Sequence, residues 1–404
     1  MSQTPSLVTP PSKLEKFVHG TLQAGLHLER RFEPFFRPAL NAILREPSAW
    51  LLQALINLPR RNEGLKLAEE TIQPDEEASI QAMIDLLGTY MREHWKPGNF
   101  QRGGNTKTHG IVRGEFIVRD DIPSHMRRGV FAKPQTFRAW VRFAGPGPDI
   151  PRDIDDVGFA SCSFKLMGVH GPKLMADEKF TQDFTSVSTP TFVTPNVKAN
   201  AALQAQILRG TPVFYFWKPG SSHILDFFMQ SLWNETQTSP LEARYWSTVP
   251  YLLGEGQAMM YSVRPKLKGR SWIPGIPFHP ADNYLRDALV KALAERDAEF
   301  DFLVQVQTDS HRMPIEHAGV RWPEKLSPFV PVATLRLPKQ KFDSPKQFAF
   351  AHNLSINPWH CIPEHRPLGS QSRGRHRMYW ELSQLRQRMN GTPHIEPTGD
   401  EVFD

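Results

Sequence analysis

Residues 373–386 read R-G-R-H-R-M-Y-W-E-L-S-Q-L-R, and the interpretation of the whole chain starts from this stretch. If it forms a helix, Arg375 and Tyr379 lie one turn apart on one face, and Arg386 returns to that face two turns later. A guanidinium beside a phenol favours the ionised phenolate, and arginine keeps its charge at any physiological pH. Because a phenolate oxygen suits ferric iron, the stretch indicates either an iron ligand with its cationic partner or a surface helix with a basic face.

Composition describes a globular protein without the features of a nucleic-acid partner. The 404 residues are 40% hydrophobic, and a formal net charge of +6 is spread along the chain. No run of five or six like charges forms a basic tail, so nucleic-acid binding is not expected. Two cysteines, Cys162 and Cys361, are too few for a disulfide framework and lack zinc-site spacing, which fits a cytoplasmic, reducing environment. The sequence shows no signal peptide and no stretch of about 18 apolar residues.

The first 95 residues are expected to form a helical extension. Residues 14–58 are apolar and favour helix, but four prolines predict breaks in this region: Pro34, Pro38, Pro47 and Pro59. Residues 49–58, A-W-L-L-Q-A-L-I-N-L, favour packing on the core, with an apolar channel or a membrane surface as the other possibilities. Apolar positions at helical spacing predict an amphipathic helix over residues 80–95.

Beyond residue 96 the pattern changes to strands. Strands are predicted at 114–118, 138–144, 158–169, 184–192, 257–265, 299–308 and 329–337. Residues 196–250 favour helical or irregular structure with many aromatic side chains, and residues 287–298 predict a helix. Seven or eight strands without regular helix alternation predict an antiparallel barrel with inserted helices. Phosphate loops, nucleophile elbows and H-E-x-x-H motifs are not present in the sequence.

Several short motifs follow one another in a fixed order. They are T-H-G-x-x-x-G-x-F at 108–116, V-R-F at 141–143, D-D-V-G-F-A at 155–160, T-Q-D-F at 181–184, T-P-T-F at 189–192, N-P-W-H at 357–360 and R-x-x-x-Y-(x6)-R at 375–386. Each motif alone is weak evidence for a family, but the ordered set resembles the catalase superfamily, which consists of haem proteins built on an eight-stranded antiparallel β-barrel. The resemblance covers about residues 100–390. It implies an α+β chain without the C-terminal flavodoxin-like domain of large catalases. Three segments are expected: a helical extension at 1–95, a barrel core with a helical insertion at 96–345, and a wrapping segment with the proximal haem helix at 346–404.

The resemblance also implies a cofactor and the residues that bind it. Tyr379 would be the axial phenolate ligand of a ferric haem b, and Arg375 would keep that phenolate ionised. Arg142 and Arg386 match positions that pair with haem propionates, which require fixed cations. His109 matches the distal histidine that moves a proton between the two peroxide oxygens.

Three positions around this histidine depart from true catalases. Thr108 stands where catalases usually carry a hydrophobic residue, and its hydroxyl is expected to bond and restrain the His109 imidazole. Val187 occupies the position of the distal asparagine, and Ala144 replaces the serine of the catalase R-F-S segment. The Thr-His pair also marks the catalase-related allene oxide synthases, which act on fatty-acid hydroperoxides and dismutate hydrogen peroxide poorly.

These features predict a haem enzyme that acts on organic, fatty-acid hydroperoxides by rearrangement or peroxidase chemistry. Two alternatives stay open: a modest hydrogen-peroxide catalase or peroxidase, and a non-catalytic haem-binding barrel. The expected partner is an apolar small-molecule peroxide. The N-terminal helices and the aromatic residues at 213–233 could line an acyl channel. Peripheral membrane contact through those helices and assembly into a homo-oligomer also stay open.

Overall fold

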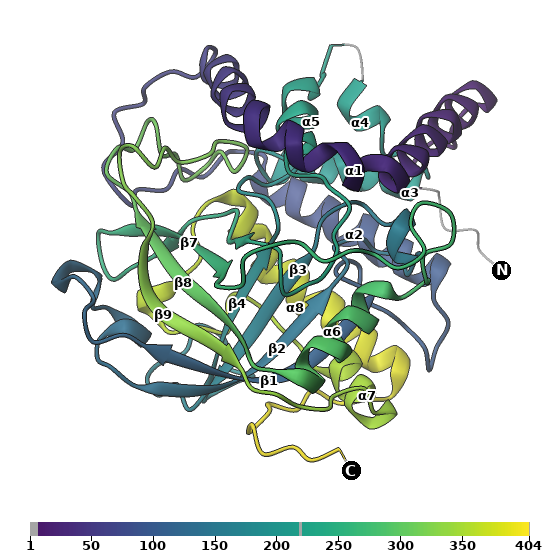
Figure 1. Cartoon of the computed structure of the whole chain (residues 1–404). Helices are drawn as coiled ribbons and strands as arrows, with labels where there is room; N and C mark the ends of the chain where they lie inside the picture. Colours follow the sequence, from purple (N-terminus) through teal and green to yellow (C-terminus); the bar gives the residue numbers. More distant parts are fainter. Residues whose placement is uncertain (1–6, 218–219, 404) are drawn as a thin grey trace.

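The computed structural model describes residues 7–217 and 220–403, and its centre is an antiparallel barrel (Figure 1). The strands are β1 (Thr108–Val118), β2 (Thr136–Ala144), β3 (Ser161–Met167), β4 (Thr181–Val187), β5 (Tyr245–Trp246), β6 (Tyr251–Leu252), β7 (Ala258–Pro265), β8 (Ala298–Val306) and β9 (Val330–Leu337). They lie in the order β5-β4-β3-β2-β1-β9-β8-β7-β6, and pairing of β5 with β7 closes the ring. The eight-stranded barrel predicted from the sequence is confirmed, with β6 added at its rim.

Helices surround the barrel on several sides (Figure 1). The described residues form α1 (Lys13–Asn57), α2 (Glu76–His94), α3 (Val197–Leu208), α4 (Phe214–Trp217), α5 (Ile224–Ser231), α6 (Tyr284–Glu295), α7 (Pro345–Asn353) and α8 (Ser370–Asn390), with 3₁₀ turns at Ser124–Met126, Gly129–Phe131, Asp153–Asp155 and Pro363–His365. In Figure 1, α1 crosses the top of the molecule beside α4 and α5, and α8 runs behind the strands. An apolar cluster joins α2 to α8.

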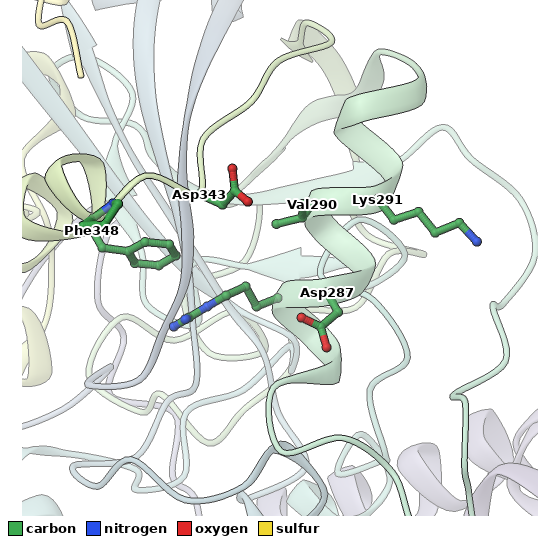
Figure 2. A pocket seen from close by; sticks show the side chains of 7 residues that line it. Asp287, Val290, Lys291, Asp343 and Phe348 are labelled. Atoms are coloured by element: carbon green, nitrogen blue, oxygen red, sulfur yellow. The ribbon is translucent and has the colours of Figure 1, made fainter. Parts of the chain in front are cut away.

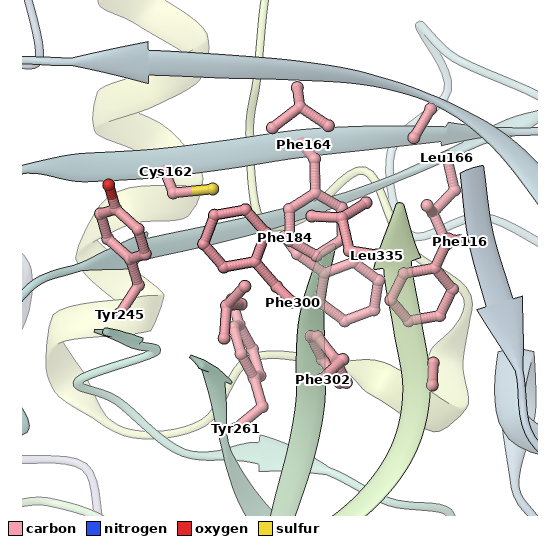
Figure 3. Close-up of a cluster of buried hydrophobic side chains, with 14 of the residues drawn as sticks. Phe116, Cys162, Phe164, Leu166, Phe184, Tyr245, Tyr261, Phe300, Phe302 and Leu335 are labelled. Carbon is pink, nitrogen blue, oxygen red and sulfur yellow. The ribbon is translucent and has the colours of Figure 1, made fainter. Parts of the chain in front are cut away.

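Aromatic side chains fill the barrel interior (Figure 3). The Phe184 ring lies in the middle of this group, with its centroid 5.2 Å from those of Phe164 and Phe302 and 5.3 Å from that of Tyr261. All four side chains are at most 1% exposed. Eight-stranded barrels are just wide enough for side chains to fill. The functional residues must therefore be sought on the outer face of the barrel.

The breaks predicted between residues 14 and 58 are wrong. One helix, α1, runs through Pro34, Pro38 and Pro47. Proline has no N–H, so Pro34 leaves the carbonyl of Arg30 without its helical donor. The hydroxyl of Thr236 donates to that carbonyl at 2.7 Å. A side chain from another part of the fold thus replaces the missing bond, which a local sequence pattern could not reveal.

Two strand boundaries also differ from prediction. β1 begins at Thr108 rather than Gly114, so the T-H-G motif belongs to the strand. β4 spans Thr181–Val187 rather than 184–192, because the following residues leave the sheet at the S-T-P sequence. Both changes place motif residues at strand ends, next to loops.

Candidate functional site

The register of β1–β4 brings the predicted distal positions into one row. Thr108 lies opposite Ala144, Ala144 opposite Ser161, and Ser161 opposite Val187. Directly opposed residues point to the same face of a sheet. Because Phe143, the neighbour of Ala144, lies in the barrel core, the row lies on the outer face. Three strand spacings separate its ends by about 14 Å.

His109 lies at an irregularity in β1. The pairing of β1 with β2 shifts between Thr108 and Gly110, as in a β-bulge, a feature that redirects side chains. The imidazole is 1% exposed, and its Nδ1 has no hydrogen-bond partner among the described residues. At Gly110, a Cβ atom would lie 2.5 Å from the Phe342 ring, so the tight packing here requires glycine.

The surroundings of His109 keep its imidazole neutral. Burial, followed by the charges of Lys107, Arg286 and Arg142, lowers the pKa of His109 to about 3. Asp153 Oδ1 lies 3.7 Å from its Nδ1, but the same oxygen lies 2.6 Å from the Lys107 ammonium. A neutral imidazole keeps one ring nitrogen as an acceptor, so His109 can accept a hydrogen bond at neutral pH.

Three arginines with no acidic partner gather beside this row. Arg142 and Arg386 are buried and Arg102 is half-buried. Burial lowers the pKa of all three; the charges of Arg142 and Arg386 lower that of Arg102 further, and the charge of Arg386 lowers that of Arg142. Each donates to main-chain carbonyl oxygens, and none forms a salt bridge with a carboxylate of the described residues. Buried cations without counter-charges are unfavourable, so the cluster fits an anionic ligand. Arg102 was missed because one arginine before two glycines carries no local signal.

Thr108 contacts this arginine cluster. Its hydroxyl accepts a hydrogen bond from Arg142 Nη2 at 2.6 Å, and its carbonyl accepts one from Arg286 Nη2 at 2.9 Å. The expected bond from Thr108 to the His109 imidazole is not among the hydrogen bonds of the described residues. Thr108 instead fixes the main chain from which His109 projects.

The arginines at the start of α8 differ in their partners. Two of them form salt bridges with carboxylates: Arg373 with Glu70, Glu76 and Glu316, and Arg377 with Glu77 and Glu381. Arg375 is 9% exposed, has no acidic partner among the described residues, and leaves Nη1 without a hydrogen bond. Its guanidinium lies 5.0 Å from the centroid of the Phe192 ring. The interpretation as a surface cation therefore holds for Arg377 and not for Arg375.

Tyr379 follows Arg375 by one turn on the same face of α8. It is half-buried and packs against the apolar cluster between α2 and α8. Farther along this face, Arg386 joins the arginine cluster beside β2. The structure thus brings α8 next to the distal row, although no hydrogen bond or salt bridge in the described chain joins Tyr379 to His109.

A polar network holds the N-P-W-H segment between the barrel and α8. The Lys165 ammonium lies 2.7 Å from Asp183 and also binds Glu178, while His360 Nδ1 lies 3.0 Å from Asp183. Trp359 Nε1 donates to a carbonyl in the first turn of α8 at 2.7 Å. Glu178, Asp183 and His360 are close enough to hold a metal ion, but Lys165 already supplies the positive charge there. We assign the network to positioning α8.

A groove of about 650 Å³ lies between α6 and α7 (Figure 2). Arg286 lies in it with its guanidinium 4.2 Å from the centroid of the Phe348 ring. The same guanidinium bonds the carbonyl of Thr108, so one side chain joins this groove to the residue before His109.

Solved structures of catalases have a similar overall fold. A bacterial catalase matches with a TM-score of 0.50 and 14% identity, over 81% of this chain and 63% of that chain. Catalase A from Saccharomyces cerevisiae matches with a TM-score of 0.50 and 13% identity, over 84% of this chain and 71% of that chain. The chain has the catalase-like fold. It spans less than two thirds of the bacterial catalase, and neither a family model nor a curated protein matches its sequence. At this identity the likeness covers the catalase-like fold alone.

Proposed function

We propose that this catalase-like chain binds haem and uses it to convert peroxides. The observation that carries the proposal is the environment of Arg375. Its guanidinium is buried, has no acidic partner among the described residues, and lies one helical turn from the phenol of Tyr379. Arg373 and Arg377, by contrast, are both paired with carboxylates. An uncompensated buried cation is unfavourable. The phenolate of Tyr379, bound to ferric iron, would supply the missing negative charge.

The other unpaired groups fit the same cofactor. Haem carries two propionates, and the half-buried Arg102 with the buried Arg142 and Arg386 forms a cationic cluster without a carboxylate partner in the described chain. Arg142 Nε is buried without a hydrogen-bond partner and could bind one propionate oxygen. The cluster and the Arg375–Tyr379 pair both involve α8, so one ligand could contact both.

Bound haem would supply the iron at which the peroxide O–O bond is cleaved. The chain itself would supply the proton transfer. His109, held neutral by its surroundings, would move a proton from one peroxide oxygen to the other. Burial of the imidazole keeps that proton from exchanging with bulk water.

We propose an organic, fatty-acid hydroperoxide as the substrate, converted by rearrangement or peroxidase chemistry. The row Thr108–Ala144–Ser161–Val187 supports this choice. The Thr108 hydroxyl is already bonded to Arg142, and Ala144 and Val187 offer only methyl groups. Few polar groups are left there to orient a molecule as small as hydrogen peroxide, while an acyl chain gains from apolar contact.

The test is an absorption spectrum of the purified protein, followed by separate additions of hydrogen peroxide and a polyunsaturated fatty-acid hydroperoxide. We expect a Soret band, lost in Tyr379→Phe, and faster consumption of the lipid hydroperoxide. Vigorous oxygen release from hydrogen peroxide would instead support a catalase. A Tyr379→Phe protein that keeps the wild-type spectrum would overturn the assignment of the ligand, and haem binding without peroxide conversion would indicate a non-catalytic barrel.

A further inference from the structure

Helix α1 is oriented with its charged side toward the protein. Arg30 and Glu33 are buried, and Arg30 donates to Asn234 at 2.7 Å. Arg45 lies 3.3 Å from Glu235, and Arg60, just after the helix, donates to a carbonyl of the loop after β8. A helix on the surface of a globular protein normally turns its charges outward. Between residues 30 and 45 of α1 this arrangement is reversed.

The opposite side of α1 exposes large apolar side chains along almost its whole length. They are Leu14, Phe17, Leu22, Leu26, Leu28, Phe32, Phe35, Phe36, Leu40, Ile43, Leu44, Trp50, Leu51 and Leu55, followed by Leu58. Within residues 20–58, all of which the structure describes, Glu46 is the one exposed charged residue, and it pairs with Arg321 at 2.8 Å. A 45-residue helix is about 70 Å long. Monomeric proteins rarely expose an apolar patch of more than a few hundred Å², so this side of α1 should be covered.

Residues 49–58 show both sides of the helix. Ala49 and Ile56 are buried against α5 and its surroundings, as the sequence favoured. Trp50 and Leu58 are 73% and 78% exposed. Packing on the core therefore accounts for only one side of this segment.

Neighbouring segments extend the apolar surface. The Trp272 ring packs edge-on against Phe35 with 5.2 Å between centroids, and Trp272 remains 58% exposed. Phe278, whose carbonyl accepts a bond from Arg31, is 71% exposed. Figure 1 shows α1 along the edge of the molecule that lies away from α7 and the C-terminus. No helix among the described residues is both long and apolar enough to cross a bilayer.

We propose that this side of α1 lies in the surface of an anionic lipid bilayer. Leu, Phe and Trp are the residues that helices in a membrane interface insert among the acyl chains. Exposed cations lie at both ends of the apolar side, Lys13 and Lys16 in its first turn and Arg61 after it, and Lys268 lies in the loop that carries Trp272. Cations near the surface are attracted to acidic headgroups. An interface with a second copy would carry about one hydrogen bond per 100–200 Å², and this side of α1 offers few groups to form them.

The proposal goes beyond the haem chemistry and does not depend on it. If the substrate is a fatty-acid hydroperoxide, as proposed above, the same contact would hold the protein where such substrates form. Binding to lipid can be measured on protein with or without haem, so failure of either proposal would not affect the other.

The test is flotation of the full-length protein with phosphatidylcholine vesicles, with and without phosphatidylserine. Ile43→Glu, at a position 71% exposed on α1, is compared with Ile395→Glu, 73% exposed near the C-terminus. We expect binding to the anionic vesicles, about tenfold or more weaker in Ile43→Glu and unchanged in Ile395→Glu. Lys13→Glu combined with Lys16→Glu should reduce the preference for phosphatidylserine. Thermal unfolding of each variant confirms that it is folded.

Two results would overturn the proposal. One is wild-type protein that binds neither vesicle but forms an oligomer that Ile43→Glu dissociates, as seen by light scattering; the apolar side of α1 would then be an interface between copies. The other is equal vesicle binding by Ile43→Glu and wild type, which would place the lipid contact elsewhere.

Discussion

Arg375 and Arg377 lie two residues apart on the same helix, yet only Arg377 has acidic partners. This difference gives a matched pair of variants. A phenolate ligand at Tyr379 is favoured by a cation one helical turn away, and Arg375→Leu removes that cation. We therefore expect Arg375→Leu to lower the haem content and haem affinity of the protein. Arg377→Leu removes the same charge from the protein surface and should leave both unchanged. A Soret titration of each apoprotein with haem measures this, and equal affinities would remove Arg375 from the site.

His109 gives a prediction about pH. Because its pKa is lowered to about 3 by burial and nearby cations, it stays neutral above that value. Peroxide turnover, as kcat/KM, should thus show no acid limb near the usual histidine pKa of about 6.5. His109→Gln should keep haem and lose about 10²-fold or more in turnover, the usual contribution of a general base. A fall of kcat/KM below about pH 6.5 in the wild type, or undiminished turnover in His109→Gln, would contradict this role.

At the scale of single residues, the sequence predicted which residue types belong to the site and in what order they follow. It did not predict which of them contact one another in space. The T-H-G and V-R-F motifs located His109 and Arg142, and the row across β1–β4 then followed from strand register. Neither the bulge at His109 nor the contribution of Arg102 was predictable, since both depend on which loop packs on which strand. The bond from Thr108 to Arg142 was missed for the same reason.

Between elements, the N-P-W-H segment couples β4 to α8 through His360. Burial and the Lys165 charge oppose protonation of His360. Hydrogen bonds to Asp177 and Asp183, together with the charge of Glu178, outweigh them and raise the pKa of His360 to about 9. The folded state therefore binds this proton more tightly than the unfolded state. The resulting stability is fully present below about pH 6.5 and is lost as the pH rises through 9.

We accordingly expect His360→Gln to remove a pH dependence of stability. Between about pH 6.5 and 9, the free energy of unfolding of the wild type should fall relative to the variant by up to about 3 kcal/mol. His170→Gln, at an exposed histidine, is the control and should follow the wild type. Urea unfolding at several pH values measures the difference. A wild type and variant that run parallel across this range would show that His360 is not held protonated.

Helices and strands differed in how well local patterns predicted them. Strand-like runs located β2, β3, β7, β8 and β9 to within about three residues, whereas β1 begins earlier than predicted. Alternation in β8 was informative because it reports directly on which side chains face the core. The sequence predicted breaks within α1, because a proline in an isolated helix removes a backbone hydrogen bond and usually ends the helix. The Thr236 hydroxyl, more than two hundred residues away in the chain, satisfies the carbonyl that Pro34 leaves free. The sequence did not single out α7 either.

For the whole molecule, the ordered motifs predicted the fold better than any single pattern. They lie at strand ends, at the N-P-W-H turn and on α8, and these places come together only in the closed barrel. The T-Q-D-F and N-P-W-H motifs meet directly, since Asp183 accepts a hydrogen bond from the main chain of Asn357 at 2.7 Å. The order of the motifs was informative because motifs far apart in the sequence contact one another in the folded chain. The division into three segments at residues 95 and 345 stays a prediction.

The aromatic core should determine the stability of the whole barrel. Phe184 is 1% exposed and contacts rings from β1, β3, β7 and β8 (Figure 3). Its neighbours on β4, Asp183 and Thr185, face outward, so a cavity at this position would loosen both surfaces of the strand. We expect Phe184→Ala to lower the free energy of unfolding by about 3–5 kcal/mol, as for other buried phenylalanines.

Phe180, in the turn before β4, gives the control for this loss. It is 53% exposed, and Phe180→Ala should change the free energy of unfolding by less than about 1 kcal/mol. Urea denaturation compares the two variants, and a shifted midpoint with an unchanged m-value identifies a change in stability. Similar losses in both variants would mean that the barrel interior is not the cooperative core. The distal row and Asp183 lie on the outer surface of these same strands, so a loss confined to Phe184→Ala would show that the strands that carry the site depend on the packing of the barrel interior.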